Sequence, residues 1–248
     1  MKPNGTAILN GDDPAVQKIA KDWNGTKLQF GLSEGCDIRA ENIQRTGYQG
    51  ISFDLIYGKK RRKTAIPYIY KSFLYNFLAA SAAAYALSTP FTHILAQTKT
   101  LKSFPMRGEL YRLPNNIILI DDSYNSNPAA LESALKDLSE LEAKRKVAVL
   151  GDMLELGEAQ TTYHVEAGKQ VQQNAWNLLI TVGPLSHYMV EGALQAGMND
   201  GQITSFESSE EAANHVSSLL EPGDLVLVKG SRGIKTEKIV ERLKKKGN

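Results

Sequence analysis

Residues 118–128 read ILIDDSYNSNP, an apolar run that stops abruptly at seven polar residues and a proline. The apolar part is typical of a buried parallel strand, and the proline stands where a new helix would begin. In open α/β sheets, ligands bind just beyond the carboxyl ends of the strands. A single helix cap at Asn127 would need one residue of the Asp, Asn or Ser type, whereas six of the seven polar residues here are of that type. We therefore predict an α/β fold with a functional site at this strand end.

The composition describes an ordinary globular protein of 248 residues, with 42% hydrophobic and 23% charged residues. This length suits one large or two ordinary domains. The formal net charge of +2 gives no reason to expect a nucleic-acid or membrane partner. The single cysteine, Cys36, excludes a disulfide framework. No apolar run is long enough for a membrane span, and no signal peptide is recognisable, so we expect a cytoplasmic protein.

The front part of the chain mixes strands and helices separated by glycine-rich turns. One basic run, Lys59–Lys63, has two interpretations. It could contact phosphate or nucleic acid, but the near-neutral total charge favours a solvated hairpin turn between strands at 51–57 and 64–67. Further strands are predicted at 7–9, 27–32 and 37–43, and helices at 14–22, 72–87 and 90–101.

The pattern changes near Phe104-Pro105, where we place a domain boundary, giving domains 1–104 and 105–248. After it, strands alternate with helices, which indicates a Rossmann-like, doubly wound, mostly parallel sheet with right-handed crossovers. The predicted strands are 109–113, 117–122, 146–151, 177–182, 202–206 and 224–229. The predicted helices are 128–142, 160–174, 185–196, 208–220 and 235–245.

Four loops that follow these strands carry unusual residues, and such loops share one edge of a parallel sheet. They are 121–127, 151–157, 182–184 and 229–233. The last contains Lys229 and Arg232 beside two glycines, which suits an anionic ligand, although the alternative is only a turn that glycine permits. Arg107, at the domain boundary, could bind phosphate or pair with Glu109 at the surface.

Several familiar signatures are missing. The sequence contains neither G-x-x-x-x-G-K-[ST] nor G-x-G-x-x-G, so a dinucleotide-binding Rossmann domain is not expected. The four histidines lack the spacing of metal ligands, and we expect each to be a surface or capping residue: His93, His164, His187 and His215. We predict no metal site within the chain.

With these motifs in order, the chain resembles the Mur ligases, and among them the branch that adds D-alanyl-D-alanine. Two motifs are specific to that branch, Asp-Asp-Ser-Tyr-Asn at 121–125 and Gly-Asp-Met-x-Glu-Leu-Gly at 151–157. The other matching motifs occur in the family's order: LNGDD at 9–13, NFLAA at 76–80, RGE at 107–109 and KGSRG at 229–233.

The resemblance implies that residues 1–104 form the incomplete back portion of an α/β ATPase domain. Residues 105–248 would then be a complete C-terminal domain. The P-loop, the Mg²⁺ ligands and the lysine that is carbamylated in many members would lie upstream of Met1, in a missing N-terminal part of the same enzyme. We therefore expect this chain to be inactive alone.

The implied reaction is ATP-driven amide formation between UDP-MurNAc-tripeptide and D-Ala-D-Ala, with Mg²⁺ as a cofactor, in peptidoglycan precursor synthesis. ATP would phosphorylate the tripeptide carboxylate, and the dipeptide amine would attack the acyl phosphate. Carried over from the family, Arg107 would contact the γ-phosphate and the acyl phosphate, Asp122 the ribose, and Asn76 the adenine. The remaining predicted contacts form the dipeptide pocket: Tyr124, Asn125, Asn127, Lys229 and Ser231. Asp152 and Glu155 have a structural alternative, in which they stabilise their own loop rather than contact a ligand.

Two other functions remain open. The chain could be a non-catalytic module that retains a nucleotide or dipeptide site. It could also be a related ligase such as folylpolyglutamate synthase, which the Asp-Asp-Ser-Tyr-Asn motif disfavours. A longer reading frame upstream of Met1 would favour part of a ligase over the stand-alone module.

Overall fold

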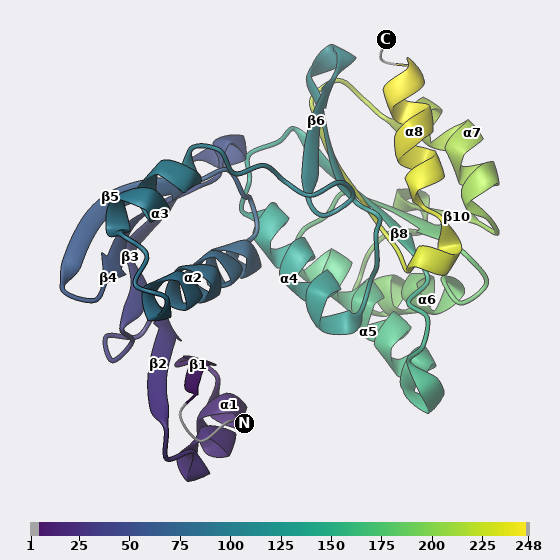
Figure 1. Cartoon of the computed structure of the whole chain (residues 1–248). Helices are drawn as coiled ribbons and strands as arrows, with labels where there is room; N and C mark the ends of the chain where they lie inside the picture. The colour runs from purple at the N-terminus through teal and green to yellow at the C-terminus, as the bar shows by residue number, and fades with distance from the viewer. Residues whose placement is uncertain (1–4, 247–248) are drawn as a thin grey trace. The chain divides into compact units, whose positions relative to one another are not determined.

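The computed structural model describes residues 5–246. The chain divides into two compact units, Met1–Lys102 and Ser103–Asn248. The predicted boundary between residues 104 and 105 lies two residues further along. Each unit has its own sheet (Figure 1).

The first unit is built on a five-stranded sheet in the order β1-β2-β3-β4-β5. β1, β2 and β3 are parallel, and β4 and β5 continue the sheet as antiparallel strands. The strands are β1 (Thr6–Asn10), β2 (Thr26–Gly31), β3 (Ile38–Arg45), β4 (Ile51–Tyr57) and β5 (Lys60–Ile66). The helices are α1 (Pro14–Ile19), α2 (Lys71–Ala86) and α3 (Phe91–Thr98).

The core of the first unit lies between its sheet and α2. Leu74, Leu78 and Ala82 recur at the four-residue spacing that places side chains on one helix face, and all three are buried. They join one apolar cluster with sheet residues that include Phe53 and Leu55. The predicted alanine-rich helix therefore packs through small and branched residues.

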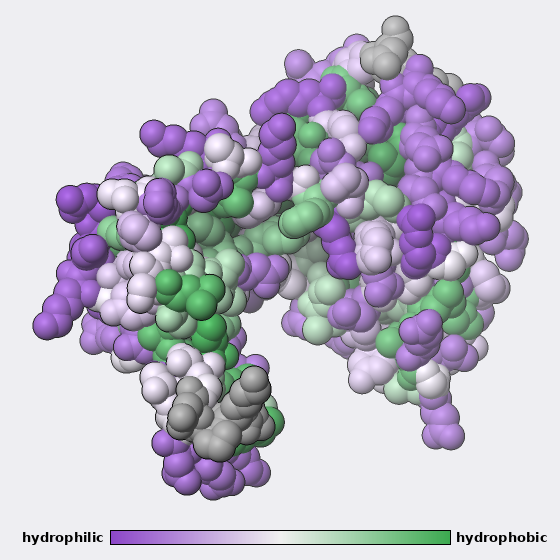
Figure 2. Space-filling model, viewed as in Figure 1, coloured by the Kyte–Doolittle hydropathy of each residue, from purple (hydrophilic) through white to green (hydrophobic). Residues whose placement is uncertain are grey.

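The expected position of the basic run was wrong. The hairpin between β4 and β5 exists, but its turn consists only of Gly58 and Lys59, and Gly58 has a φ of 60°. Residues 60–63 belong to β5, which is an edge strand. A two-residue turn needs no long solvated loop, and positive charge on an edge strand discourages pairing with other chains. Figure 2 shows hydrophilic side chains projecting from this hairpin at the left of the view.

The second unit is built on a six-stranded sheet in the order β10-β9-β8-β11-β7-β6. All neighbouring strands are parallel except β6, which forms an antiparallel hairpin with β7. The strands are β6 (Glu109–Leu113), β7 (Ile117–Asp122), β8 (Arg145–Gly151), β9 (Leu178–Val182), β10 (Ile203–Phe206) and β11 (Asp224–Lys229).

Helices cover both faces of this sheet, as the doubly wound prediction requires. Figure 1 shows α4, α5 and α6 on one face and α7 and α8 on the other. They are α4 (Pro128–Ser139), α5 (Gln160–Gln173), α6 (His187–Gln195), α7 (Ser209–Leu219) and α8 (Glu237–Lys246). No helix among residues 5–246 is long and apolar enough to cross a membrane.

The central strands of this sheet are buried on both faces. In β11, Leu225, Val226, Leu227 and Val228 are all fully buried. A parallel strand covered by helices on both sides needs apolar residues at every position rather than at alternate positions. The abrupt change from these residues to Lys229 marks where the strand leaves the core and the site begins.

We expect trypsin to cut the native chain first in the segment that connects the two units. Lys99 and Lys102 are exposed and follow the end of α3, so a protease can reach the backbone there. The product should be a stable fragment that begins at Thr100 or Ser103, identified by mass spectrometry. Chymotrypsin should spare Phe104, although it is exposed, because Pro105 follows it. Equal loss of both units, without this fragment, would contradict the division.

Candidate functional site

The carboxyl ends of β7, β8 and β11 lie side by side, and Ser231 connects the loops that follow them. Its N–H donates to the carbonyl of Asp152 at 3.0 Å. Its hydroxyl accepts from the N–H of Leu154 at 2.9 Å and donates to the carbonyl of Ser126 at 3.3 Å. Three of the four loops predicted to converge are therefore held together by one serine.

Asp152 connects the fourth loop, which follows β9. Its side chain is fully buried, and its Oδ2 accepts from the N–H of Leu185 at 3.0 Å. Burial raises the pKa of Asp152, although the hydrogen bond from Leu185 opposes this shift. Its Oδ1 has no hydrogen-bond partner among the described residues. These contacts fit the alternative reading of Asp152 as a residue that braces its loop.

A buried ion pair joins the ends of β7 and β11. The Nζ of Lys229 lies 2.7 Å from the Oδ2 of Asp122, and it also donates to the carbonyl of Asn125 at 3.0 Å. Lys229 is 3% exposed and Asp122 is 8% exposed. Burial raises the pKa of Asp122 above its usual value, and the Lys229 ammonium opposes the shift only in part. Lys229 therefore fixes the end of β7 through Asp122 and the loop after β7 through the Asn125 carbonyl.

The other polar residues of the predicted cluster have different partners. Asp121 accepts from the N–H of Ser123 at 3.1 Å and from its hydroxyl at 2.5 Å. Asn127 is the N-cap of α4, because its side chain accepts from the N–H of Ala130 at 2.9 Å. Pro128 occupies the first position of that helix. Capping and site residues are therefore combined in one loop.

Two arginines lie close to the ring of Tyr124, which is 45% exposed. The guanidinium carbon of Arg107 is 4.1 Å from the ring centroid, and that of Arg232 is 5.9 Å away. Arg107 forms no ion pair with any residue among 5–246, and the Glu109 carboxylate instead accepts a hydrogen bond from Tyr111. The surface pair of Arg107 with Glu109 is therefore not formed. The stacked guanidinium keeps its charge available for an anion.

A cleft of about 410 Å³ opens between the loops after β7, β8 and β11. This volume is within the usual range for small-molecule sites. The cleft is lined by Tyr124, Asn125, Ser126, Asn127, Leu154, Glu155, Leu156, Ser231, Arg232 and Gly233. Four of the predicted dipeptide-pocket residues are in this set. The fifth, Lys229, does not line the cleft and contacts a lining residue through its hydrogen bond to the Asn125 carbonyl.

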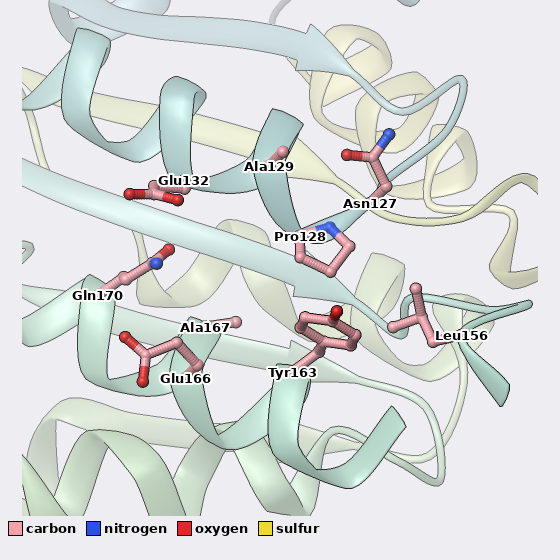
Figure 3. A pocket seen from close by; sticks show the side chains of 9 residues that line it. All are labelled: Asn127, Pro128, Ala129, Glu132, Leu156, Tyr163, Glu166, Ala167 and Gln170. Atoms are coloured by element: carbon pink, nitrogen blue, oxygen red, sulfur yellow. The ribbon is translucent and has the colours of Figure 1, made fainter. Parts of the chain in front are cut away.

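A second hollow of about 490 Å³ lies beside this cleft, between α4 and α5. Asn127 and Leu156 line both. Figure 3 shows the ring of Tyr163 below Pro128, and the side chains of Glu132 and Glu166 coming from the two helices. Because its charged side chains are both acidic, this hollow differs in character from the cleft that contains Arg232.

The remaining predicted contact, Asn76, lies on α2 in the first unit, where its side chain is exposed. It is therefore not one of the residues that the second unit brings together. Among the described residues, no group of three or more His, Cys, Asp or Glu side chains could hold a metal ion.

The expected surface or capping position of His164 was wrong. This residue is fully buried, and its Nε2 accepts from the N–H of Met153 at 3.0 Å. Its Nδ1 lies 2.7 Å from the carbonyl of Gln160 and donates to it, since the other nitrogen accepts. The signal was available: His164, Ala167, Gly168 and Val171 follow the i, i+3, i+4, i+7 spacing of a buried helix face.

Comparison with protein families matches both parts of the chain. The model described as "Mur ligase, glutamate ligase domain" matches residues 106–232, and the "Mur ligase middle domain" matches residues 1–84.

Curated relatives that match the chain include two proteins with the name UDP-N-acetylmuramoyl-tripeptide–D-alanyl-D-alanine ligase. The protein from Bacillus subtilis (strain 168) is 29% identical over 245 residues, covering 98% of this chain and 52% of the relative. The protein from Buchnera aphidicola subsp. Acyrthosiphon pisum is 30% identical over 248 residues, with the same two coverages. The chain therefore spans about half the length of the curated relatives that it matches.

The fold is also similar to solved structures. MurF from Acinetobacter baumannii has a TM-score of 0.85 at 24% identity, covering 98% of this chain and 52% of that one. A MurF ligase from Thermotoga maritima in complex with ADP has a TM-score of 0.82 at 22% identity, covering 98% and 54%. Both units thus have the fold of these proteins.

We predict that Lys229→Met destabilises the second unit by about 3–5 kcal/mol, because it leaves the Asp122 carboxylate buried without its partner. Urea unfolding followed by Trp176 fluorescence, in a Trp23→Phe background, measures this change. Lys238→Met is the matched control, since Lys238 pairs with Glu210 at the surface between α7 and α8. It should cost less than about 1 kcal/mol. Equal effects of the two substitutions would contradict the structural role of the buried pair.

Proposed function

This chain belongs to the Mur ligase family, and we propose that it forms part of an ATP-dependent ligase that joins D-Ala-D-Ala to UDP-MurNAc-tripeptide. The observation that supports this most strongly is similarity along 98% of the chain to ligases with that name. The Asp-Asp-Ser-Tyr-Asn motif at 121–125 supports the same branch, because these residues stand at the strand end where ligands bind in such sheets.

The proposed reaction forms an amide in two steps. The terminal carboxylate of the tripeptide attacks the γ-phosphorus of ATP, which gives an acyl phosphate and releases ADP. The dipeptide amine then attacks the acyl carbon, loses a proton, and expels inorganic phosphate from the tetrahedral intermediate. Phosphoryl transfer depends mainly on positioning and on stabilising charge, so the residues needed are charged and well oriented rather than nucleophilic.

Arg107 fits the stabilising role. Its guanidinium is held against Tyr124 and lacks an ion-pair partner among the described residues, so its charge is not already neutralised. Charge on the transferred phosphoryl group and on the tetrahedral intermediate grows during the reaction, and a preorganised cation lowers the energy of both. In this proposal Asp122 contacts the ribose and Asn76 the adenine, as the family resemblance implies.

The second unit supplies the framework for the amino substrate. Ser231 joins the three loops around the cleft, and Lys229 fixes the Asn125 carbonyl, so the lining residues keep their positions before a ligand arrives. Such preorganisation reduces the entropy cost of binding. Tyr124, Asn125, Asn127 and Ser231 are the proposed contacts of the dipeptide.

Mg²⁺ would supply charge neutralisation for the ATP phosphates in such an enzyme. The described residues contain no cluster of donor side chains for a metal ion, and we assign none of them to Mg²⁺. A cytoplasmic location, where ATP and the UDP-linked substrate would meet, belongs to the same proposal.

The proposal is tested with a fusion of this chain to the preceding part of the Bacillus subtilis relative. We expect the folded fusion to release ADP when ATP, Mg²⁺, UDP-MurNAc-tripeptide and D-Ala-D-Ala are all present. The chain alone should release none, because its sequence contains no Walker A motif to hold the phosphates. Circular dichroism and gel filtration establish that the fusion is folded before the assay.

The outcomes separate the possible functions. A folded fusion that binds the dipeptide but forms no amide would favour a non-catalytic binding module. Turnover with another amino substrate in place of D-Ala-D-Ala would favour a different ligase. ADP release by the chain alone above a heat-inactivated control would contradict the expected inactivity.

In the fusion, Arg107→Ala should lower kcat by about 10³-fold, because comparable arginines stabilise the transition state of phosphoryl transfer by that much. Arg107→Lys should recover little, since lysine lacks the planar fork of the guanidinium. Arg112→Ala is the matched control, because Arg112 is exposed on β6. Steady-state kinetics decide the matter. Near-normal kcat in both Arg107 variants would contradict the proposed role.

A further inference from the structure

The charge of this chain is distributed unevenly along the sequence. Residues 55–102 contain eight lysines and arginines and no aspartate or glutamate. The basic residues are Lys59, Lys60, Arg61, Arg62, Lys63, Lys71, Lys99 and Lys102. Because the whole chain carries a formal net charge of only +2, the remaining residues are acidic overall. The near-neutral total therefore conceals a strongly basic part of the first unit, and the charge of that part has to be considered separately.

The two faces of β5 differ in how their charges are neutralised. Side chains alternate along a strand, so Arg61 and Lys63 lie on one face, and Lys60 and Arg62 lie on the other. Arg61 pairs with Asp54 at 2.7 Å, and Asp54 is also the register partner of Lys63. Lys60 and Arg62 are exposed and form no ion pair with any residue among 5–246. The second face therefore keeps its positive charge.

The end of α2 packs against the hairpin beside these unpaired cations. Lys60 lies directly opposite Tyr57 in the antiparallel pair, so both side chains are on the same face. The ring of Tyr57 packs edge to face with that of Tyr85, at 4.9 Å between centroids. A Cβ added to Gly58 would lie 2.8 Å from the Tyr85 hydroxyl. The Tyr57 hydroxyl also donates to the carbonyl of Thr89 at 2.9 Å, which fixes the chain that follows α2.

Between Tyr85 and Thr89, the chain exposes a large apolar side chain. Leu87 is 81% exposed, whereas the leucines inside α2 are buried. Its backbone is held at the helix end, because its N–H donates to the carbonyl of Ala83 at 3.2 Å. A single exposed leucine is common on protein surfaces. A leucine next to unpaired cations, in a segment without acidic residues, is the combination found where proteins lie on membrane surfaces.

Protection of an edge strand explains only part of this pattern. Charged side chains on β5 hinder pairing with other chains, but charges of either sign would do so. Such protection gives no reason for the exposure of Leu87, or for the absence of acidic residues from 55 to 102. A surface that attracts an anionic layer and inserts an apolar side chain into it accounts for all of these features.

Nucleic acid is a less suitable anion for this surface. Its phosphates could neutralise the cations, but Leu87 would have no apolar partner. Tyr85 gives no free platform for a base, because its ring already packs with that of Tyr57. An anionic lipid layer supplies both the phosphates and the apolar environment, so it matches more of the observed residues.

We propose that this end of the first unit binds the surface of an anionic lipid bilayer. The proposed surface, which we call the basic end, consists of Lys59, Lys60, Arg62, Tyr85 and Leu87. The cations approach the lipid phosphates, and Leu87 enters the boundary between headgroups and acyl chains. Binding is peripheral and reversible, because it uses few cations and a single aliphatic side chain. The inference goes beyond the proposed function, which assigns none of these residues to ATP or to the dipeptide.

Cosedimentation of the full chain with lipid vesicles tests the proposal. Wild type should bind vesicles made of equal parts phosphatidylcholine and phosphatidylglycerol, and should not bind vesicles of phosphatidylcholine alone. Binding should be largely lost in about 1 M salt, where the Debye length falls to about 3 Å. The fusion described above should bind as the chain does, because its added part joins before β1, at the opposite edge of the sheet from β5.

Substitutions then measure the contribution of each side chain. Lys60→Gln and Arg62→Gln should each lower the partition coefficient about 5-fold, which is the usual contribution of one cation near an anionic lipid surface. Leu87→Ser should lower it about 10-fold, because the inserted apolar surface is lost. Circular dichroism should show no loss of structure, since all three side chains are exposed.

Two substitutions serve as matched controls. Lys63→Gln makes the same change in charge on the other face of β5, opposite Asp54. Ile19→Ser removes an aliphatic side chain that is 79% exposed, close to the value for Leu87, but that lies on α1. Each should leave the partition coefficient nearly unchanged.

Quenching by brominated lipid reports insertion directly. Leu87→Trp should lose fluorescence when the chain binds anionic vesicles with brominated acyl chains. Leu194→Trp, at an exposed position on α6, should not lose it. The native tryptophans contribute equally to both variants, so the difference between the two isolates the introduced indole.

The proposal would be overturned by equal binding to both kinds of vesicle, by no binding to either, or by loss of binding in the folded fusion. It would also fail if Lys63→Gln acted as strongly as Lys60→Gln, or if Leu87→Ser had no effect. Tighter binding to duplex DNA than to anionic vesicles would identify nucleic acid as the partner instead. The proposed function is tested separately, because only the fusion assay reports amide formation.

Discussion

The ion pair between Lys229 and Asp122 is the contact on which the site depends. The two residues are register partners at the ends of adjacent parallel strands, and their charges lie 2.7 Å apart in a buried setting. Removing two charges from water is costly, and the pair persists because each charge meets the other and Lys229 also bonds the Asn125 carbonyl. Two residues later, Ser231 ties the neighbouring loops together. The geometry of the cleft therefore depends on the contacts at the ends of β7 and β11.

Much of the second unit could be predicted from the sequence, because its strands are apolar runs with sharp ends. The ranges 109–113, 117–122 and 224–229 match β6, β7 and β11 to the residue. Local patterns were misleading where the surroundings decided the outcome. The basic run 60–63 looked like a turn, but a two-residue turn at Gly58 left it in an edge strand. We expected His164 to be a surface or capping residue, but two backbone groups form hydrogen bonds with its ring nitrogens inside the core.

The candidate site, too, could be predicted only in part from the sequence. Motifs were sufficient to name the strand-end loops, since parallel strands place such loops on one edge. They did not reveal that the Lys229 ammonium is occupied by a partner 107 positions away in sequence. Nor did they show that Arg107 stacks on Tyr124 instead of pairing with Glu109. Charge pairing between distant residues depends on the folded geometry, which no local pattern encodes.

We propose that this strand-end cleft holds the amino substrate of an amide ligase. A crystal structure of the chain grown with D-Ala-D-Ala tests it most directly, because it shows the position of the ligand. We expect density for the dipeptide in the cleft, in contact with the proposed residues Tyr124, Asn125, Asn127 and Ser231. A dipeptide bound in the hollow between α4 and α5, or a cleft without dipeptide density, would contradict this proposal.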